Sequence, residues 1–534
     1  MPFPVSANST SVSVASPIFL PESEENENAE YFENITKEAA QELAGSIEIQ
    51  SEVPATKPSL ISDLDNSLVG WDSENDPKNP RNWSSRTKLG VLILVGILGF
   101  MIPSVSTLFA PGEPLMAKEF HLTNHIVQQL TISVYVLGFG WGPLVHAPMS
   151  EMYGRQYVIL ISNILFTGLN LGCSEARNVA MLLVFRLLTS ICGCAGMVVG
   201  AGIISDLYPP EEIGRATAVF MLGPIMGPML GPILGGFISQ RAGWRWTIRV
   251  IICMGGVMTV VLVLLVPETN AAVLLRRKAA SLAKSTGRID LVSIIDSRLP
   301  KVSPRQRLAT AFVRVAKLLC ISPVIQMFTL FMLIAYAYLY IFFTTITLVM
   351  TTKYGWPMES AGLAFIGIGC GTAFSVAVVG GTNDKLVKYL TKRNGGVRQP
   401  EMRLGPLLFG SIMIPTAMFW YGWAVQRHVH WFVVIMSFFP CGAGMIASLH
   451  PTQAYLIDLY GPLGAAASAT AALNLTRCTA AALIPLCVPS LIARFDYGLG
   501  YSILGILGFA LCSSMSVFFV WYGQSFRERF PPRI

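Results

Sequence analysis

Long apolar runs alternate with short polar connections from about residue 89 to residue 522. A helix needs about 20 predominantly apolar residues to cross the hydrocarbon core of a bilayer. Lipid offers backbone groups no hydrogen-bond partner, so each run of that length predicts one membrane-spanning helix. The twelve predicted spans are residues 89–110, 127–148, 156–174, 179–204, 216–239, 246–267, 324–350, 360–381, 404–424, 430–457, 466–491 and 499–522.

The spans divide six and six around the long polar segment 271–322. Three short motifs recur at corresponding places in the two halves. They are the G-x-G-x-G runs at 138–142 and 367–371, the Asp-Leu-Tyr triplets that begin at Asp206 and Asp458, and the acidic residues Glu151 and Asp384 after spans 2 and 8. Such repeats are typical of transporters whose halves move about a central site. We therefore expect an all-α integral membrane protein with twelve transmembrane helices in two parallel six-helix repeats.

The composition agrees with a membrane protein, because only 13% of the residues are charged whereas soluble domains carry about 25%. Residues 1–76 hold 15 acidic and two basic residues, a net charge of −13. Because the whole chain has a net charge of +7, the remaining residues carry a net charge of +20. The acidic and aperiodic segment 1–87 predicts a disordered tail. The basic residues of the body lie between apolar spans, which argues against nucleic-acid binding.

The positions of the basic residues predict the orientation. Eleven Lys and Arg residues lie in 271–322 and six more in 382–403, and such loops are cytoplasmic by the positive-inside rule. An even number of spans then places both termini in the cytoplasm. The expected domains are a cytoplasmic tail (1–87), two six-helix halves (88–270 and 323–525), a basic cytoplasmic linker (271–322) and a cytoplasmic C-terminus (526–534). Arg241, Arg245 and Arg249 are exceptions, since they fall on the outer side.

Span 5 carries a regular pattern of glycine and proline. The glycines recur every four residues, which forms one stripe on a helix and permits close backbone approach, and each following proline removes a backbone donor and loosens the helix. The stripe comprises Gly223, Pro224, Gly227, Pro228, Gly231, Pro232, Gly235 and Gly236. A tight contact between helices is the simplest interpretation. We expect this bendable stripe to lie at the interface between the two halves.

The stripe is similar to the span-5 antiporter motif of exporters in the major facilitator superfamily. The segment GPLVHAPMSEMYGR (142–155) also resembles that superfamily's signature between spans 2 and 3. Glu151 stands where the pattern has Asp, Gly154 and Arg155 match it, and Met152 and Ala147 depart from its usual Arg and Gly. A turn with one acid and one base can clamp helix ends in one state and release them in another. We expect a gate formed by Glu151, Gly154, Arg155 and the corresponding Asp384.

Further segments resemble the fungal twelve-span drug:proton antiporters, and the resemblance covers residues 70–530. They are GWDSENDPKNPRNW (70–83), DLYPPEEIGRA (206–216), WRW (244–246), PET (267–269), VLLRRKA (273–279) and YLIDLY (455–460). Sugar carriers of the superfamily have a PESPR-like run after span 6, where this chain has PETNA. The resemblance implies the major facilitator fold and proton-driven export, and it leaves the substrate open.

Ionisable residues inside spans are functional candidates because burying them is unfavourable. Arg186 occupies the position of the superfamily's span-4 Arg, which the resemblance implicates in proton movement. His146 and Asp206 are further candidates for proton coupling, although a packing histidine and a salt bridge to a loop arginine are the simpler interpretations. Gln453 and Arg477 are candidates for the cavity lining. No Asp or Glu lies deep in a span, which disfavours cationic substrates and suits neutral or anionic ones.

These observations predict a monomeric, proton-coupled exporter of small lipophilic compounds, such as a secondary metabolite, a toxin or an antifungal drug, in the cell membrane. Its expected partners are the substrate, protons and the lipid bilayer. The sequence has no paired metal-ligand spacing, no nucleophile–base set and no G-x-x-x-x-G-K-[ST] loop, so no metal, cofactor, enzymatic activity or ATP drive is expected. An uptake carrier and a non-transporting receptor on the same fold remain alternatives.

Overall fold

The computed structural model describes residues 61–62, 65–209, 212–298, 303–396, 399–461, 463 and 465–531. Residues 61–534 form one compact unit. Most of the predicted tail, residues 1–60, therefore lies outside the described residues, as do Asp63, Leu64 and the last three residues of the chain.

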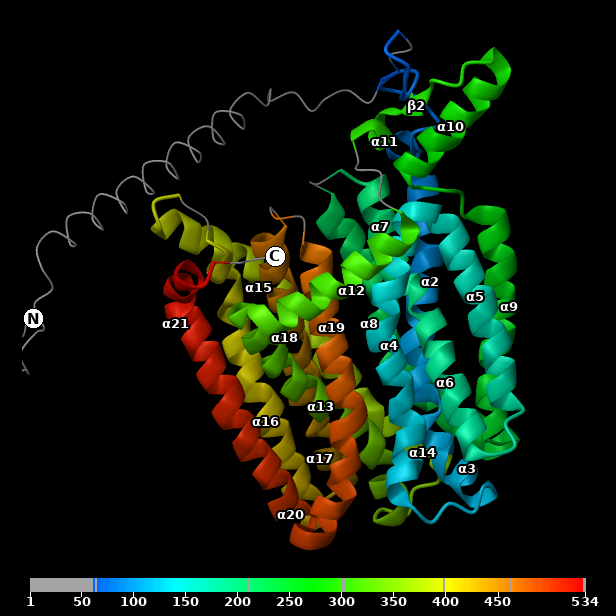
Figure 1. Cartoon of the computed structure of the whole chain (residues 1–534). Helices are drawn as coiled ribbons and strands as arrows, with labels where there is room; N and C mark the ends of the chain where they lie inside the picture. Colours follow the sequence, from blue (N-terminus) through cyan, green and yellow to red (C-terminus); the bar gives the residue numbers. More distant parts are fainter. Residues whose placement is uncertain are drawn as a thin grey trace, which may run out of the picture. The chain divides into compact units, whose positions relative to one another are not determined.

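The described part of the first half contains six helical segments long and apolar enough to span a membrane, and Figure 1 shows how they are arranged. They are α2 (Ser85–Leu108), α4 (His125–Tyr153), α5 (Arg155–Ser174), α6 (Val179–Gly193) continued by α7 (Ala195–Leu207), α8 (Ile213–Ala242) and α9 (Trp244–Leu265). Two short elements, η2 (Ala110–Gly112) and α3 (Glu113–Glu119), follow α2. Polar residues begin several of these helices: the Asn124 side chain accepts a hydrogen bond from the backbone of Ile126 (2.9 Å), and Asn178 accepts one from Met181 (2.8 Å).

The second half repeats this plan. Its helices are α13 (Pro323–Thr352), α14 (Met358–Ala361) with η3 (Gly362–Phe365) and α15 (Ile366–Arg393), η4 (Pro400–Leu404) with α16 (Gly405–Gln426), α17 (Trp431–Met436) with α18 (Phe438–Tyr460), α19 (Ala466–Leu483) with η5 (Ile484–Cys487), and α20 (Val488–Gly508) with η6 (Phe509–Ser513) and α21 (Ser514–Arg529).

Eleven helical segments of the described chain are long and apolar enough to cross a membrane. The last of them, Ala466–Arg529, has 64 residues, about three times the length that a bilayer requires. It contains two spans, because Asp496 has a φ of 58° and interrupts the helix inside α20. Figure 1 shows α21 returning along the bundle from that turn. The twelve-span, two-repeat architecture predicted from the sequence is thereby confirmed.

The predicted linker is mostly helical and binds part of the predicted tail. It contains α10 (Ala271–Thr286), β2 (Val292–Ser293), α11 (Ile294–Arg298) and α12 (Pro304–Ile321). Strand β1 (Leu68–Val69) pairs with β2 in parallel, and Lys278 donates hydrogen bonds to the carbonyl oxygen of Gly70 (2.8 Å) and to Asp72 (2.6 Å). Trp71 is buried. The prediction of disorder is therefore wrong for this described part of the tail, because contacts about 200 residues away in sequence order it.

A bidentate ion pair stabilises the linker itself. Arg276 of α10 donates hydrogen bonds of 2.8 and 2.7 Å to the two carboxylate oxygens of Asp296 in α11. These hydrogen bonds, opposed by partial burial, hold the pKa of the Asp296 carboxyl below its ordinary value. The linker is thus a folded element that connects the two halves.

The three arginines on the predicted outer side each have a carboxylate partner. Arg241 lies 3.5 Å from Glu359, Arg249 lies 3.2 Å from Glu175, and Arg245 pairs with Glu119. The Arg241–Glu359 pair joins α8 of the first half to α14 of the second. These ion pairs explain how positive residues are accommodated at the end of the bundle opposite the linker.

The two G-x-G-x-G runs make equivalent contacts. In α4, a Cβ at Gly138 or Gly142 would overlap Ser190 or Cys194 of the same half, whereas a Cβ at Gly140 would lie 2.7 Å from Cys478 in α19 of the other half. The outer glycines thus pack within a half, and the middle one packs between halves.

In α15, Gly367 and Gly371 pack against backbone carbonyl groups of the α17–α18 region, which belongs to the same half. A Cβ at the middle residue, Gly369, would lie 2.5 Å from Met229 of α8 in the first half. The matching geometry supports the repeat inferred from the sequence and identifies α4–α19 and α15–α8 as equivalent contacts between halves.

The glycine stripe of α8 packs differently from the prediction. Its four evenly spaced glycines face α2 of the same half, where an added Cβ would meet a row of backbone oxygens that also recur every four residues. The facing pairs are Gly223 with Gly96, Gly227 with Phe100, Gly231 with Ser104, and Gly235 with Leu108. The expectation that these glycines lie between the halves is wrong.

The neighbouring residues of α8 do face the other half. Successive residues of a helix point about 100° apart, so the prolines occupy a different face from the glycines. Pro224 and Pro228 line a cavity between the halves, and Gly236 approaches the backbone of Met358 in α14. The pattern of α8 thus serves a tight contact inside one half on one face and the interface between halves on the next.

We predict that Gly223→Ala and Gly235→Ala destabilise the protein by about 1–3 kcal/mol each, because the new methyl group overlaps a backbone oxygen of α2. Thermal unfolding of the purified protein in detergent measures this as a lower midpoint temperature. Gly256→Ala in α9 is the matched control, since its Cβ meets no atom within 4 Å. Equal midpoints for all three variants would contradict the proposed packing.

Candidate functional site

A central cavity of about 190 Å³ lies between the two halves. Helices α2, α4, α7 and α8 line it from the first half, and α13, α15, α18 and α19 line it from the second. Its wall is mainly apolar and aromatic, with contributions from Phe139, Met229, Tyr336, Phe343 and Met445. A site between two halves that pack through narrow glycine contacts is suited to alternating exposure.

Both residues predicted for the cavity, Gln453 and Arg477, line it. Arg477 donates hydrogen bonds from Nε (3.0 Å) and Nη2 (2.7 Å) to the side-chain oxygen of Asn474, and its guanidinium lies 4.4 Å from the ring centroid of Tyr336. The Asn474 side chain also donates to the backbone oxygen of Phe139 in the first half (3.4 Å). Arg477 is therefore held in a fixed position at the contact between the halves.

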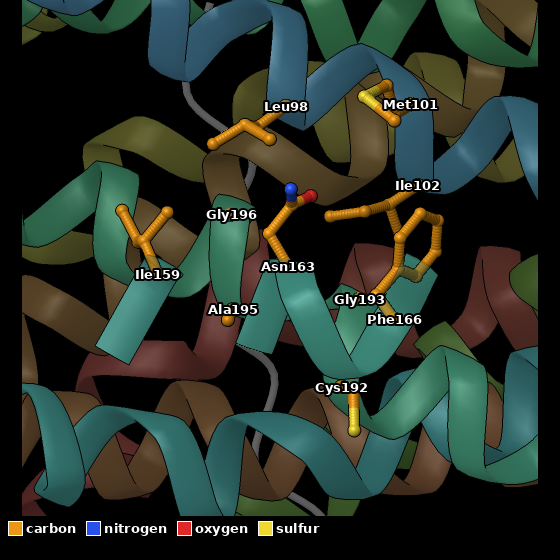
Figure 2. A pocket seen from close by; sticks show the side chains of 10 residues that line it. All are labelled: Leu98, Met101, Ile102, Ile159, Asn163, Phe166, Cys192, Gly193, Ala195 and Gly196. Carbon is orange, nitrogen blue, oxygen red and sulfur yellow. The ribbon is translucent and has the colours of Figure 1, made fainter. Parts of the chain in front are cut away.

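A second, much smaller cavity lies inside the first half (Figure 2). Its volume of about 10 Å³ is near the minimum for one water molecule. It lies beside the junction of α6 and α7, where Cys192, Gly193 and Ala195 contribute to its wall. Asn163, which also lines it, donates to the backbone oxygen of Gly255 and to Thr259. This cavity is a packing defect and is too small for an organic substrate.

Arg186 is buried behind the wall of the central cavity. Its guanidinium lies 4.1 Å from the ring centroid of Phe109 and 5.4 Å from that of Tyr135, which lines the cavity. Its Nε and Nη2 atoms have no hydrogen-bond partner among the described residues. A buried charge that packs against aromatic faces and has two nitrogens without partners among the described residues is energetically unfavourable, and this supports a functional role for it.

His146 does not line the central cavity. Its Nδ1 atom lies 2.9 Å from the carbonyl oxygen of Gly142 and 3.7 Å from the sulfur of Cys194, and the side chain is buried. These contacts within the first half favour the packing interpretation of this histidine.

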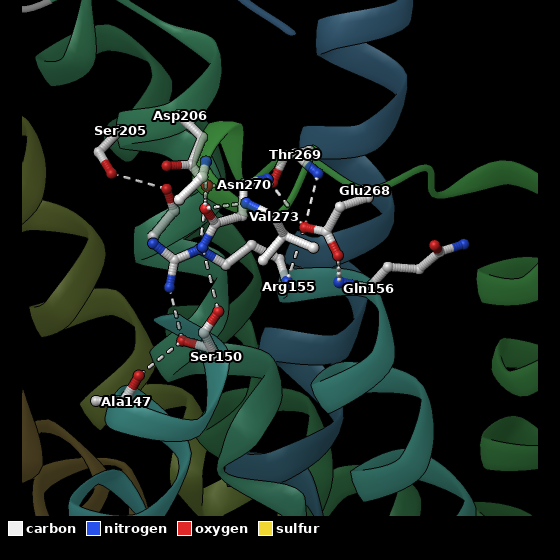
Figure 3. Close-up of polar contacts among 12 residues, drawn as sticks. Ala147, Ser150, Arg155, Gln156, Ser205, Asp206, Glu268, Thr269, Asn270 and Val273 are labelled. Atoms are coloured by element: carbon white, nitrogen blue, oxygen red, sulfur yellow. Dashed lines mark hydrogen bonds and ion pairs between the residues drawn. The ribbon is translucent and has the colours of Figure 1, made fainter. Parts of the chain in front are cut away.

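The predicted gate residue Arg155 occupies the centre of a polar cluster at the linker end of the first half (Figure 3). Its Nε donates to Asp206 (3.0 Å), and its Nη1 donates to Ser150 (2.6 Å). Thr269 donates a further hydrogen bond to Asp206 (3.3 Å). The Arg155–Asp206 pair ties the start of α5 to the end of α7, in agreement with the simpler interpretation of Asp206.

Glu268 completes this cluster and was missed as a functional residue. Its buried carboxylate accepts backbone hydrogen bonds from Arg155 (2.8 Å), Gln156 (3.3 Å) and Asn270 (2.9 Å). A carboxylate is favoured at this position by the positive end of the α5 dipole. Gly154 has a φ of 102°, and a Cβ there would overlap Glu268. The sequence offered one signal for Glu268: it is an acidic residue directly after span 6, on the same side of the membrane as the signature turn.

The other predicted gate residues lie outside this cluster. Glu151 is exposed on the last turn of α4 and has no hydrogen-bond or ion-pair partner in the described part of the chain. The acids that contact Arg155 are Asp206 and Glu268 instead. Asp384 belongs to α15, and its side chain lies outside the described residues.

The second half has an equivalent cluster. Arg403, immediately before α16, lies 3.0 Å from Asp458 near the end of α18, and it thereby matches Arg155 with Asp206. Glu401 is also buried there and accepts a hydrogen bond from Arg527 (2.7 Å). Arg403 and Glu401 were not predicted as site residues. The offset of 252 residues between Asp206 and Asp458 places the counterpart of Arg155 at Leu407, so the repeat spacing did not identify Arg403.

Glu113 is another residue that the sequence analysis missed, since it lies just beyond the predicted first span. It begins α3 and lines a cavity of about 780 Å³ at the end of the bundle opposite the linker, with residues such as Lys118, His121 and Gln129 of the first half. Residues of α13 and α20 line the same cavity from the second half. One carboxylate oxygen of Glu113 is buried and has no hydrogen-bond partner among the residues described.

Two of the predicted candidates for proton coupling lie far apart. Arg186 and Asp206 are 20 residues apart along α6 and α7, which corresponds to roughly 30 Å at 1.5 Å per residue. Direct electrostatic control of Asp206 by Arg186 is not supported at that separation.

Comparisons with known proteins agree with this architecture. A family model described as Major Facilitator Superfamily matches residues 95–485. The MFS transporter cpaT of Aspergillus oryzae is 38% identical over 90% of this chain and 95% of its own length. The MFS-type transporter penM of Penicillium rubens is 37% identical, over 87% of this chain and 90% of its own length.

Solved structures with low sequence identity share the fold. A D-xylose–proton symporter superposes with a TM-score of 0.60 and 16% identity, covering 83% of this chain and 98% of the symporter. A bacterial homologue of the human lysosomal transporter Spinster gives a TM-score of 0.57 at 14% identity, covering 85% of this chain and 100% of its own. The family model covers most of the membrane body, and the curated relatives extend the match over nearly the whole chain. This protein belongs to the major facilitator superfamily of multi-pass membrane transporters.

Proposed function

We propose that this protein exports small lipophilic organic molecules in exchange for protons, by alternating access between its two halves. The observation that carries the proposal is the apolar, aromatic cavity at the interface of the halves. A sugar or other polyhydroxylated solute needs several hydrogen-bond partners in its site, and a wall of Met, Phe and Tyr residues provides few. The wall therefore favours a lipophilic substrate.

The direction of transport is supported by α8. Its glycine and proline pattern resembles the antiporter motif of exporters, and Pro224 and Pro228 of that pattern line the cavity. The relatives are named as transporters, and those names give neither a direction nor a driving ion. Export coupled to protons is thus our inference from the motif and from the buried Arg186.

We propose that both termini and the linker lie in the cytoplasm, because the linker carries eleven basic residues. An epitope inserted after Ser285 in α10 should be inaccessible to antibody in intact cells and accessible after permeabilisation. An epitope inserted after Gly355, at the opposite end of the bundle, is the control and should be labelled in intact cells. The reverse pattern would contradict the orientation.

We propose that the Arg155–Asp206 pair acts as one unit of the gate. Both side chains are mostly buried, with exposed fractions of 12% and 18%. Removing one partner leaves the other charge buried and unpaired, whereas removing both does not. Arg155→Gln and Asp206→Asn should therefore each slow export and destabilise the protein, and the double variant should be less affected than the sum.

Unfolding free energies and initial export rates of the four proteins form a double-mutant cycle, from which we expect an interaction energy of about 0.5–3 kcal/mol. Lys284→Gln on the exposed side of α10 serves as the charge-removal control. Strict additivity would contradict the coupling. If Glu151→Gln alone reproduced the defect, the gate acid would be Glu151, as the family signature implies.

We propose that Arg186 is required for proton coupling, because its unpaired charge lies next to Tyr135 in the cavity wall. Arg186→Ala should abolish the stimulation of export by an imposed pH gradient. Arg186→Lys should retain part of it, since the charge is kept and the planar guanidinium is lost. Proteoliposomes with and without the gradient provide the measurement.

Substrate counterflow without a gradient is the control, because it reports whether the cavity is intact and still alternates. Counterflow that persists in Arg186→Ala while gradient stimulation disappears would support a role in coupling. Equal stimulation of Arg186→Ala and the unmodified protein would exclude Arg186 from it.

A further inference from the structure

We infer that the transported molecule is a lipophilic organic acid whose anionic group binds Nη1 of Arg477. This inference rests on the proposed function, because it names the substrate class of the same cavity. Among the described residues that line the cavity there is one Arg or Lys, which is Arg477, and there is neither Asp nor Glu. The site therefore has an uncompensated positive charge within an apolar wall.

The geometry of Arg477 leaves one of its three nitrogens without a partner among the described residues. Two of its three nitrogens, Nε and Nη2, bind the Asn474 oxygen, and one face of the guanidinium is covered by the Tyr336 ring. The third nitrogen, Nη1, is buried and has no hydrogen-bond partner in the described structure. The whole side chain is only 6% exposed. A buried charged donor without a partner is unfavourable, and an anionic acceptor would remove that penalty.

The groups around Arg477 define the rest of the ligand. His450 and Gln453 of α18 line the same cavity and offer further hydrogen bonds to a polar group. The remaining wall includes Phe139 and Phe343, which suit a flat apolar body. A carboxylate or an acidic enolate attached to an aromatic or aliphatic framework satisfies both parts of the site.

Other classes of substrate fit less well. A cation would be repelled by Arg477 and would find no carboxylate among the described lining residues. A neutral lipophile would fill the wall and leave Nη1 without an acceptor. The charge state of the substrate is therefore the property that this site distinguishes.

Arg186 provides an internal comparison. It is also buried and lacks partners for two nitrogens, but the rings of Phe109 and Tyr135 lie against it and it does not line the cavity. A ligand in the central cavity thus reaches Arg477 and not Arg186. The two arginines have separate roles in our model, with Arg477 in substrate recognition and Arg186 in coupling.

A matched pair of probes tests the inference. 1-Naphthaleneacetic acid is ionised at neutral pH, whereas its methyl ester is neutral and more lipophilic, so transfer from water alone favours the ester. Binding of each probe to the purified full-length protein is measured by naphthalene fluorescence. We expect the acid to bind about tenfold more tightly or better, as a charge-assisted hydrogen bond in a dry site provides.

Three variants identify the residue responsible. Arg477→Gln should remove the preference for the acid and leave the affinity for the ester unchanged, which also shows that the cavity is folded. Arg477→Lys should keep a reduced preference, because it retains charge and loses the planar geometry. Arg494→Gln, an exposed residue of α20 away from the cavity lining, is the control and should behave as the unmodified protein does.

The inference would be overturned if the unmodified protein bound acid and ester equally, if it failed to bind the acid, or if Arg477→Gln kept the preference. If Arg477→Gln does not bind the ester, Arg477→Lys decides the result. A reduced preference of that variant for the acid supports the inference, and an unchanged preference contradicts it. Export in proteoliposomes is measured separately with the acid and an imposed pH gradient. If the unmodified protein binds the acid preferentially but shows no export driven by the gradient, the proposed function is contradicted and the anion site is still supported.

Discussion

Close approach between helix backbones is the constraint on which this structure depends. In lipid there is little hydrophobic gain from bringing two helices together, so their association depends on packing that small residues permit. The contact of α8 with α2 shows this most clearly, because four glycines of one helix face four backbone oxygens of the other. With that face fixed inside the first half, the adjacent face of α8 is free to line the cavity and to meet the second half. The same helix thus connects the packing of one repeat to the central cavity.

Ion pairs between charged side chains also hold helices together, and they lie at the two ends of the bundle. At the linker end, partly buried carboxylates and arginines tie the ends of helices together within each half, and the Arg155–Asp206 and Arg403–Asp458 pairs are equivalent in the two repeats. At the opposite end, arginines pair with acids in short connections. Arg186 and Arg477 depart from this pattern, since neither has a carboxylate partner among the described residues. In our proposal these two charges are retained against their energetic disadvantage because Arg186 serves coupling and Arg477 serves recognition.

The sequence predicted the helices and the repeat well, because both follow from local properties. A run of about 20 apolar residues has one stable arrangement in a bilayer, and glycine spacing on a helix is fixed by its 3.6-residue period. The Asp-Leu-Tyr triplets that begin at Asp206 and Asp458 could be recognised as a repeat because they are short local motifs. The break at Asp496 was anticipated by the polar gap between the last two predicted spans, although it lies within one continuous helical run of the structure.

Tertiary structure decided which faces meet. The period of span 5 revealed the stripe, but only the packing showed that its evenly spaced glycines contact α2 and that Pro224 and Pro228 line the cavity, because helical periodicity does not specify the neighbour. The ordered part of the tail was missed since β1 and Trp71 depend on a linker about 200 residues away. Glu268 and Arg403 were missed because their partners come from other helices. The sequence by itself therefore determined the number and kind of helices, whereas the partners of charged groups and the lining of the site required the three-dimensional arrangement.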